Sequence, residues 1–267
     1  MADSKIAVLI PVFNNQKGLD ITLRSIEANA IEGLEVVVVD DGSRPPIMLN
    51  TSLKQTVLVL EKNVGIVEGL NKGLEYIIEK DIPYIARVDA DDIVVENRFA
   101  EQLNFLESHP DVGLVGSWVD MFTDKGSVFP LRFAETDHEI RNRMHISNPF
   151  QHPAVMYRTS VIKEIGYYRD DYPAAEDYEI FMRMLQVTKG HNIPKLLTRY
   201  YIGNPDSITN TSRSKQYKAR LKIQCRYFDA RNPYSYCGIL ITLLMLTMPV
   251  SLALWLKKLR ARLLKTW

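Results

Sequence analysis

Apolar and polar residues alternate in long blocks along the first part of the chain. Continuous apolar runs, each the length of a short buried strand, cover residues 6–10, 36–39, 56–60 and 84–88. Between the runs, apolar residues recur at helical spacing, as Leu19, Leu23 and Ile26 do. Strands that alternate with amphipathic helices predict an α/β fold, with a Rossmann-like, mostly parallel sheet and helices on both of its faces.

Polar and turn-forming residues follow the predicted strands. Pro11, Asp41, Gly65 and Asp89 each lie just past the end of one apolar run. In a parallel sheet the carboxyl ends of the strands share one edge, and ligands bind in the crevice outside that edge. We therefore expect these residues to converge on one crevice, in a nucleotide-binding half that covers residues 6–120.

The fourth apolar run ends in an acidic turn, Asp89-Ala90-Asp91-Asp92. Carboxylates that are packed so closely repel one another, and a cation would relieve the repulsion. Oxygen ligands on a turn suit Mg²⁺ or Mn²⁺ and leave room for substrate phosphate oxygens. The structural alternative is a solvated turn that caps the next helix, and this stretch alone does not decide between the two.

A second acidic pair, Glu176-Asp177, precedes a predicted helix over residues 178–185. The pair could complement the helix dipole, or it could supply a general base that accepts a proton from an attacking hydroxyl. Arg183 in this helix is either solvated or reaches a diphosphate, and His152 is expected to be a hydrogen-bonded loop residue.

The sequence has neither Gly-x-Gly-x-x-Gly after its first strand nor a Gly-Lys-Ser/Thr loop, which argues against a dinucleotide dehydrogenase and a P-loop NTPase.

Composition excludes several other classes of protein. The net charge of +1 argues against a nucleic-acid binder. Two cysteines, Cys225 and Cys237, provide neither a disulfide framework nor a zinc site and are typical of a reducing compartment. The first residues lead directly into a strand and do not have the pattern of a signal peptide.

The C-terminal part has a different character. Basic residues are frequent over residues 213–226, residues 237–256 carry no charge, and residues 257–265 are again basic. The apolar run has about the ~20 residues of a membrane span, but Pro249 interrupts it and basic residues flank it. We expect a bent, interfacial hairpin in the cytoplasmic leaflet of the membrane. A full span and a helix packed on the globular domain are the alternatives.

Five short motifs occur in the same order as in the family 2 glycosyltransferases of the GT-A fold, which residues 5–210 resemble. The motifs are Pro11-Val12-Phe13-Asn14, Val39-Asp40-Asp41-Gly42-Ser43, Asn63-Val64-Gly65 with Asn71, Val88-Asp89-Ala90-Asp91-Asp92, and Glu176-Asp177-Tyr178. The resemblance implies the GT-A fold and the transfer of a sugar, with inversion, from a nucleotide-sugar donor that is usually a UDP-sugar.

The resemblance also implies roles for individual residues. Pro11, Asp41 and Gly65 would hold the uridine, Asn71 would support their loop, Asp89 would face the ribose and the metal, Asp91 would ligate Mn²⁺ or Mg²⁺, and Asp177 would be the base. Many members of the family end this domain with a strand that carries an Arg and then a His near the metal. Here Tyr201 and Gly203 stand at those places, so water or His152 is left as the third ligand.

The sequence therefore predicts a glycosyltransferase domain over residues 1–210, with an acceptor half at 121–210, and a helical membrane-associated tail at 211–267. The expected partners are a UDP-sugar donor, a lipid-linked saccharide acceptor and the cytoplasmic face of the inner (plasma) membrane, with no nucleic acid. The product would be a bacterial surface polysaccharide: O-antigen, capsule or exopolysaccharide. A sugar nucleotidyltransferase and a catalytically inactive membrane adaptor are the alternatives.

Overall fold

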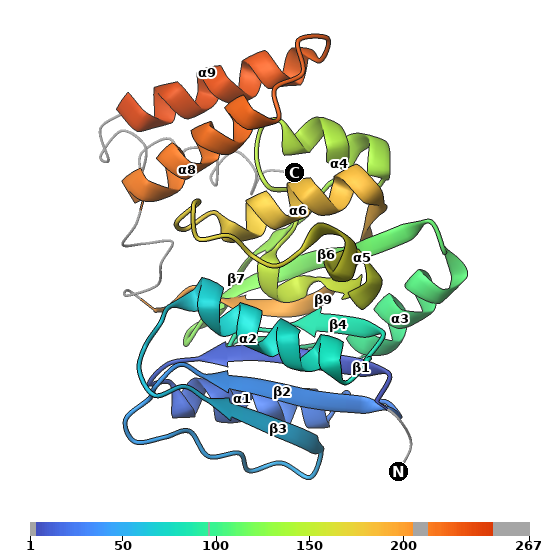
Figure 1. Ribbon diagram of the computed structural model, residues 1–267, viewed down its shortest axis with the longest axis vertical. Coiled ribbons are helices and arrows are strands. Elements are labelled where there is room, and N and C mark those ends of the chain that lie inside the picture. Colours follow the sequence, from blue (N-terminus) through green and yellow to red (C-terminus); the bar gives the residue numbers. More distant parts are fainter. Residues whose placement is uncertain (1–3, 96, 205–212, 248–267) are drawn as a thin grey trace.

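The fold is built on one nine-stranded sheet with the order β3-β2-β1-β4-β8-β6-β9-β5, in which β7 pairs with β6 (Figure 1). The computed structural model describes residues 4–95, 97–204 and 213–247. The N-terminal strands are β1 (Ile6–Val12), β2 (Leu34–Asp40), β3 (Lys54–Val59) and β4 (Tyr84–Arg87). These four strands are parallel, as the apolar runs predict.

The C-terminal part of the sheet is mixed, so the prediction of a mostly parallel sheet holds only for the first part. Its strands are β5 (Ile93–Val94), β6 (Val112–Thr123), β7 (Gly126–Leu131), β8 (Met156–Arg158) and β9 (Lys189–Tyr201). β8 is antiparallel to β4 and β6, and β5 is antiparallel to β9, whereas β6 and β9 are parallel. A tight turn joins β6 to β7 and allows only antiparallel pairing.

Helices cover both faces of the sheet, as expected (Figure 1). They are α1 (Gln16–Glu27), α2 (Ile66–Glu79), α3 (Arg98–Ser108), α4 (Asp137–Met144), α5 (Thr159–Ile165), α6 (Glu176–Val187), α8 (Arg213–Arg226) and α9 (Pro233–Thr247), with a short 3₁₀ turn at His152–Ala154. Successive residues of β1 enter different cores: Leu9 packs with residues of α2 and α6, and Val8 packs with residues of α1 and α3.

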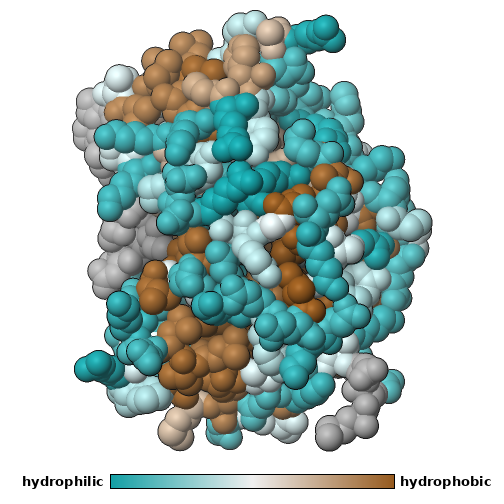
Figure 2. Space-filling view, viewed as in Figure 1, coloured by the Kyte–Doolittle hydropathy of each residue, from teal (hydrophilic) through white to brown (hydrophobic). Residues whose placement is uncertain are grey.

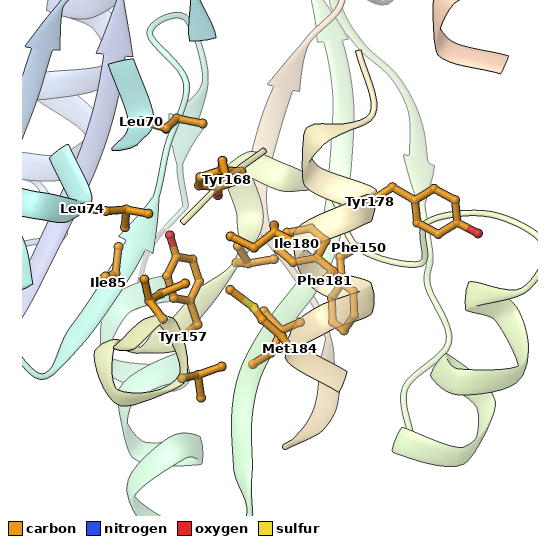
Figure 3. Close-up of a cluster of buried hydrophobic side chains, with 14 of the residues drawn as sticks. Leu70, Leu74, Ile85, Phe150, Tyr157, Tyr168, Tyr178, Ile180, Phe181 and Met184 are labelled. Atoms are coloured by element: carbon orange, nitrogen blue, oxygen red, sulfur yellow. The ribbon is translucent and has the colours of Figure 1, made fainter. Parts of the chain in front are cut away.

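The first of these cores lies beside the pocket described below. Figure 3 shows side chains of α2 and α6, among them Leu70 and Phe181, on either side of Tyr157. This packing fixes the start of α6, where the acidic pair lies, relative to the strand ends of the sheet.

β1 extends beyond its predicted end and contains Pro11. β4 pairs with β1 only as far as Leu9, whereas β2 continues alongside as far as Val12. One side of β1 therefore needs no backbone donor beyond Leu9, and an unpaired side of this kind tolerates proline. The loop that follows begins two residues later than the sequence predicts.

Helix α8 packs into the globular domain. Ala219 and Ile223 are buried and belong to the same core as α6. Gln224 Nε2 donates hydrogen bonds to the carbonyl oxygens of His145 and Ile146, at 3.1 and 3.0 Å. This basic segment is therefore a docked helix, an arrangement that the sequence offered only as an alternative.

Helix α9 lies alongside α8 and has an unusual distribution of side chains (Figure 1). The residues that it buries are small or polar, namely Ser235, Gly238 and Thr242. Its large apolar residues are exposed, with Leu240 at 59% and Leu244 at 53%. Figure 2 shows the resulting hydrophobic surface at the top of the molecule. Of the helices in the described residues, none is long and apolar enough to cross a membrane, and the rest of the apolar run, from residue 248, lies outside them.

Candidate active site

A pocket lies where the carboxyl ends of the parallel strands meet the start of α6. Its lining comes from both halves of the sheet and from the C-terminal helices, and includes Pro11, Phe13, Ile66, Asp89, Asp91, His152, Glu176, Asp177, Tyr201 and Gln216. Four of the site residues named from the sequence, Pro11, Asp89, Asp91 and Asp177, thus come together although they are far apart in the chain.

Asp41 and Gly65 lie beside the pocket and fix its wall. Asp41 is 6% exposed, and its carboxylate accepts hydrogen bonds from the backbone N–H groups of Val64 and Gly65, at 2.7 and 3.0 Å. Both bonds hold the loop before α2, whose first residue, Ile66, lines the pocket. The geometry thus places Asp41 as a support of the loop, while its predicted contact with uridine stays a prediction.

Asn71 is also a support. Its side-chain amide donates to the Tyr168 carbonyl oxygen at 3.0 Å and accepts from the Tyr168 N–H at 2.9 Å. The Tyr168 hydroxyl in turn contacts His152 Nε2 at 2.8 Å. Asn71 therefore connects α2 to the loop before α6 and, through Tyr168, to a residue of the pocket lining.

The three carboxylates of the acidic turn have separate environments. Arg87, which is buried, donates to Asp89 Oδ1 at 2.5 Å. Asp92 is fully buried, and its Oδ1 accepts the Tyr201 N–H at 2.8 Å. Asp92 is not among the residues that line the pocket, so of the three carboxylates only Asp89 and Asp91 face it. Asp89 and Asp91 alone remain available to a ligand.

Asp91 has the features of a binding residue. Its carboxylate has no hydrogen-bond partner among the described residues. Burial, together with the negative charge of Asp89, raises the pKa of Asp91 to about 7. Its φ of +150° is rare for a residue with a side chain, and strained backbone of this kind concentrates at functional sites. Among the described residues, no positively charged side chain compensates the charge of this carboxylate.

Asp177 faces the pocket from the first turn of α6. Asn148 Nδ2 donates to its Oδ2 at 2.9 Å, and the Tyr178 N–H donates to its Oδ1 at 2.7 Å. Burial raises the pKa of Asp177 to about 6, against the lowering effect of these hydrogen bonds. The neighbouring Glu176 has a pKa raised to about 7 by burial and by the charge of Asp177. Asp177 is thus an oriented carboxylate that is ionised at neutral pH.

Two other candidate residues have structural partners. Arg183 is buried and pairs with the buried Glu179 at 2.9 Å, so it is neither solvated nor directed at the pocket. It also donates to carbonyl oxygens of the segment 165–167. His152 is a hydrogen-bonded loop residue, as expected, and burial keeps the pKa of its imidazole well below the usual value. The imidazole is therefore neutral at pH 7.

The sequence profile of the family described as glycosyl transferase family 2 matches residues 7–166. The chain belongs to this family. The amylovoran biosynthesis glycosyltransferase AmsE of Erwinia amylovora is 30% identical over 209 residues, which are 74% of this chain and 76% of AmsE. An Escherichia coli protein named UDP-Gal:alpha-D-GlcNAc-diphosphoundecaprenol beta-1,3-galactosyltransferase is 26% identical over 258 residues, 90% of this chain and 89% of that protein.

Solved structures share the fold of this glycosyltransferase. The structure of S. aureus TarS 1-349 with UDP-GlcNAc has a TM-score of 0.67 at 20% identity and covers 90% of this chain and 72% of that one. The mannosyltransferase PcManGT from Pyrobaculum calidifontis, solved with GDP-Man and Mn²⁺, has a TM-score of 0.61 at 15% identity and covers 92% and 70%. The likeness at these identities shows that the glycosyltransferase has an α/β fold of the GT-A kind.

The donor atoms in the pocket are compatible with a divalent cation that also contacts substrate phosphates. The described residues include no group of three or more His, Cys, Asp or Glu side chains that could hold a metal ion. Mg²⁺ and Mn²⁺ are commonly bound through one or two carboxylates plus phosphate oxygens. The unpartnered carboxylate of Asp91, with Asp89 beside it, meets that requirement. Tyr201 adds no ligand from its hydroxyl, which donates to Asp124 Oδ2 at 2.9 Å.

Two residues of the site were missed by the sequence analysis. Asn148, which orients Asp177, precedes a proline in a loop and reads as turn chemistry. Gln216 lies in a helix that looks uniformly basic, and nothing in its sequence context distinguishes it. Their roles depend on tertiary contacts, because the loop after α4 brings Asn148 to Asp177 and the packing of α8 brings Gln216 to the pocket.

Proposed function

We propose that this glycosyltransferase moves a sugar, with inversion, from a UDP-sugar to a lipid-linked saccharide during bacterial surface polysaccharide biosynthesis. The observation that carries the proposal is that the pocket holds an oriented carboxylate, Asp177, together with the separate pair Asp89 and Asp91. An inverting transfer is a single displacement. It needs a base for the incoming hydroxyl and stabilisation of the leaving diphosphate.

In this mechanism Asp177 accepts the proton of the attacking acceptor hydroxyl. Asn148 and the Tyr178 N–H fix its orientation and leave lone pairs of the carboxylate free for that proton. Asp89 and Asp91 would hold a divalent ion, which when bound supplies positive charge to the leaving diphosphate. Arg87 holds Asp89 in place. Pro11, Phe13 and Ile66 form the wall against which the nucleoside would pack.

Similar proteins support the choice of substrates. TarS has been crystallised with UDP-GlcNAc and with UDP. The name of the Escherichia coli relative specifies UDP-Gal as donor and a diphosphoundecaprenol-linked GlcNAc as acceptor. AmsE is named for the biosynthesis of amylovoran. A UDP-sugar and a lipid-linked saccharide are therefore the donor and acceptor that we propose for this chain.

A donor panel tests the proposal. UDP release is measured for several UDP-sugars and GDP-mannose, with and without GlcNAc-diphospho-lipid acceptors, and the anomeric configuration of the product is determined by NMR. We expect acceptor-dependent release from one UDP-sugar and an inverted product. A retained configuration would contradict the mechanism. Absence of turnover with every donor would favour an inactive adaptor, and synthesis of UDP-sugar from UTP would favour a nucleotidyltransferase.

We propose further that α9 lies on the cytoplasmic face of the inner membrane. The small and polar residues of the helix face the protein, whereas Leu240, Ile241 and Leu244 are exposed. Burial of such side chains in lipid contributes roughly 25 cal/mol per Å². The neighbouring helix α8 is rich in Lys and Arg, and each basic residue near an anionic surface adds ~1 kcal/mol. Both apolar and electrostatic attraction therefore support the proposal.

A flotation assay with vesicles tests the membrane proposal. We expect the full chain to float with vesicles that contain anionic lipid, to remain bound at high salt, and to be released by detergent. The double variant Leu240→Glu/Leu244→Glu should lose most of the binding. The matched control is Val128→Glu/Phe129→Glu, which alters exposed apolar residues of β7 and should bind normally. Equal binding by both variants would show that α9 does not contact lipid.

A further inference from the structure

Gln216 is the one residue of the described pocket lining that comes from the C-terminal helices. The other lining residues all precede position 205, whereas Gln216 lies in the first turn of α8. Its side-chain amide has no hydrogen-bond partner among the described residues. An amide carries both a donor and an acceptor, and sugar hydroxyls both donate and accept.

The position of α8 is fixed independently of Gln216. Ala219 and Ile223, on the same face of the helix, are buried against α6. At its far end, Arg226 Nη1 donates to the Tyr172 hydroxyl at 3.0 Å. Gln216 is therefore held at the pocket by a packed helix.

The contacts of α8 also show which side of the pocket it borders. Arg220, one turn after Gln216, donates a hydrogen bond to the carbonyl oxygen of Ile146, and Gln224 donates to the carbonyl oxygens of His145 and Ile146. Two residues later, Asn148 in the same loop orients Asp177. The nucleoside wall comes from β1 and the start of α2 instead. Gln216 thus belongs to the side of the pocket that carries the proposed base, which is the side that an acceptor hydroxyl must reach.

We propose that Gln216 hydrogen-bonds the saccharide of the acceptor and so helps to determine which acceptor is used. The inference rests on the proposed function, because it takes Asp177 as the base that marks the acceptor side. It makes α8 a part of the substrate site, although the sequence analysis assigned the helix to a membrane tail. It also implies that a protein truncated at residue 210 lacks part of its acceptor site.

The test compares Gln216→Ala with Cys225→Ala, an exposed position on the same helix, in the full-length protein. Loss of one hydrogen bond to the acceptor should lower kcat/KM for the acceptor about tenfold. KM for the donor and hydrolysis of the UDP-sugar without acceptor should not change. Gln216→Met keeps the side-chain length without the polar atoms and should show the same loss. Cys225→Ala should match the wild type.

Each outcome has a separate meaning. An unchanged kcat/KM for the acceptor in Gln216→Ala would overturn the inference, as would a parallel rise in the donor KM, which would place the residue on the donor side. If kcat/KM for the acceptor is normal in Gln216→Met but lowered in Gln216→Ala, Gln216 contributes only by packing, and the proposed hydrogen bond is overturned. If the wild type itself transfers to no lipid-linked saccharide, the proposed function fails, and the inference fails with it. Thermal unfolding verifies that each variant is folded.

Discussion

Replacement of Asp177 by Asn is expected to lower kcat by roughly 10²–10⁴-fold, because an amide cannot accept the proton of the acceptor hydroxyl. The fold should survive. Asn is nearly isosteric, and its amide oxygen can still accept the Tyr178 N–H. The bond from Asn148 would be lost, since Asn148 Oδ1 already accepts the Phe150 N–H and the amide is not free to reverse. Because the proposed nucleoside wall comes from other residues, the affinity for UDP, measured by titration, should stay near that of the wild type.

The pH dependence gives a second signature of the same residue. A base acts only when it is ionised, and the pKa of Asp177 is raised to about 6. Activity should therefore rise with pH through about 6 and level off above it, and this limb should disappear in Asp177→Asn. Glu176→Gln is the matched control on the adjacent carboxylate and should keep most of the activity. A kcat near that of the wild type in Asp177→Asn would show that Asp177 is not the base and only stabilises the start of α6.

Loss of the Asp91 carboxylate is expected to reduce transfer by about 10³-fold or more, since a bound divalent ion stabilises the developing charge by several kcal/mol. We expect Asp91→Ala and Asp91→Gly to be equally inactive. They should differ in stability, because Gly adopts the φ of +150° without strain and Ala does not. Initial rates with Mn²⁺, with Mg²⁺ and in excess EDTA, together with denaturant unfolding, measure both effects.

Asp170→Ala, at an exposed aspartate outside the pocket, provides the control for the loss of an acidic side chain. It should keep full activity, and its activity should be abolished by EDTA as in the wild type. Full turnover of the wild-type protein in excess EDTA would show that transfer does not need a divalent ion, whatever the activity of the Asp91 variants.

Local sequence patterns were enough to predict the strand and the helix that carry the acidic residues of the site. The apolar run before Asp89 became a buried parallel strand, and Asp177 lies in the first turn of a helix as its position beside Tyr178 suggested. Helix α4 has a local signal of this kind, because Thr136 forms a capping box with Glu139 at its start. Such signals depend only on neighbouring residues.

The remaining features depend on contacts between distant residues. Asp92 reads like its neighbours Asp89 and Asp91, yet the N–H of Tyr201 on β9 draws it into the interior. Asp41 is predicted as a ligand for the donor, and the structure adds a role that the sequence does not reveal, since its carboxylate also accepts two backbone N–H groups of the loop before α2. The orientation of α9 could not be predicted from the sequence either, because its mean hydropathy indicates an apolar helix without indicating which face is buried.

The two bonds that Asp41 makes to this loop have a thermodynamic consequence. Gly42 adopts a φ of +73° and lies so close to the loop that a Cβ would be 2.5 Å from the Lys62 backbone. The segment before Ile66 is therefore held in place by contacts within the chain. Part of the conformational entropy of these residues is therefore lost when the chain folds, and less remains to be lost when a UDP-sugar binds. Any substitution that loosens Asp41 should thus weaken donor binding through entropy, with the enthalpy of the donor contacts unchanged.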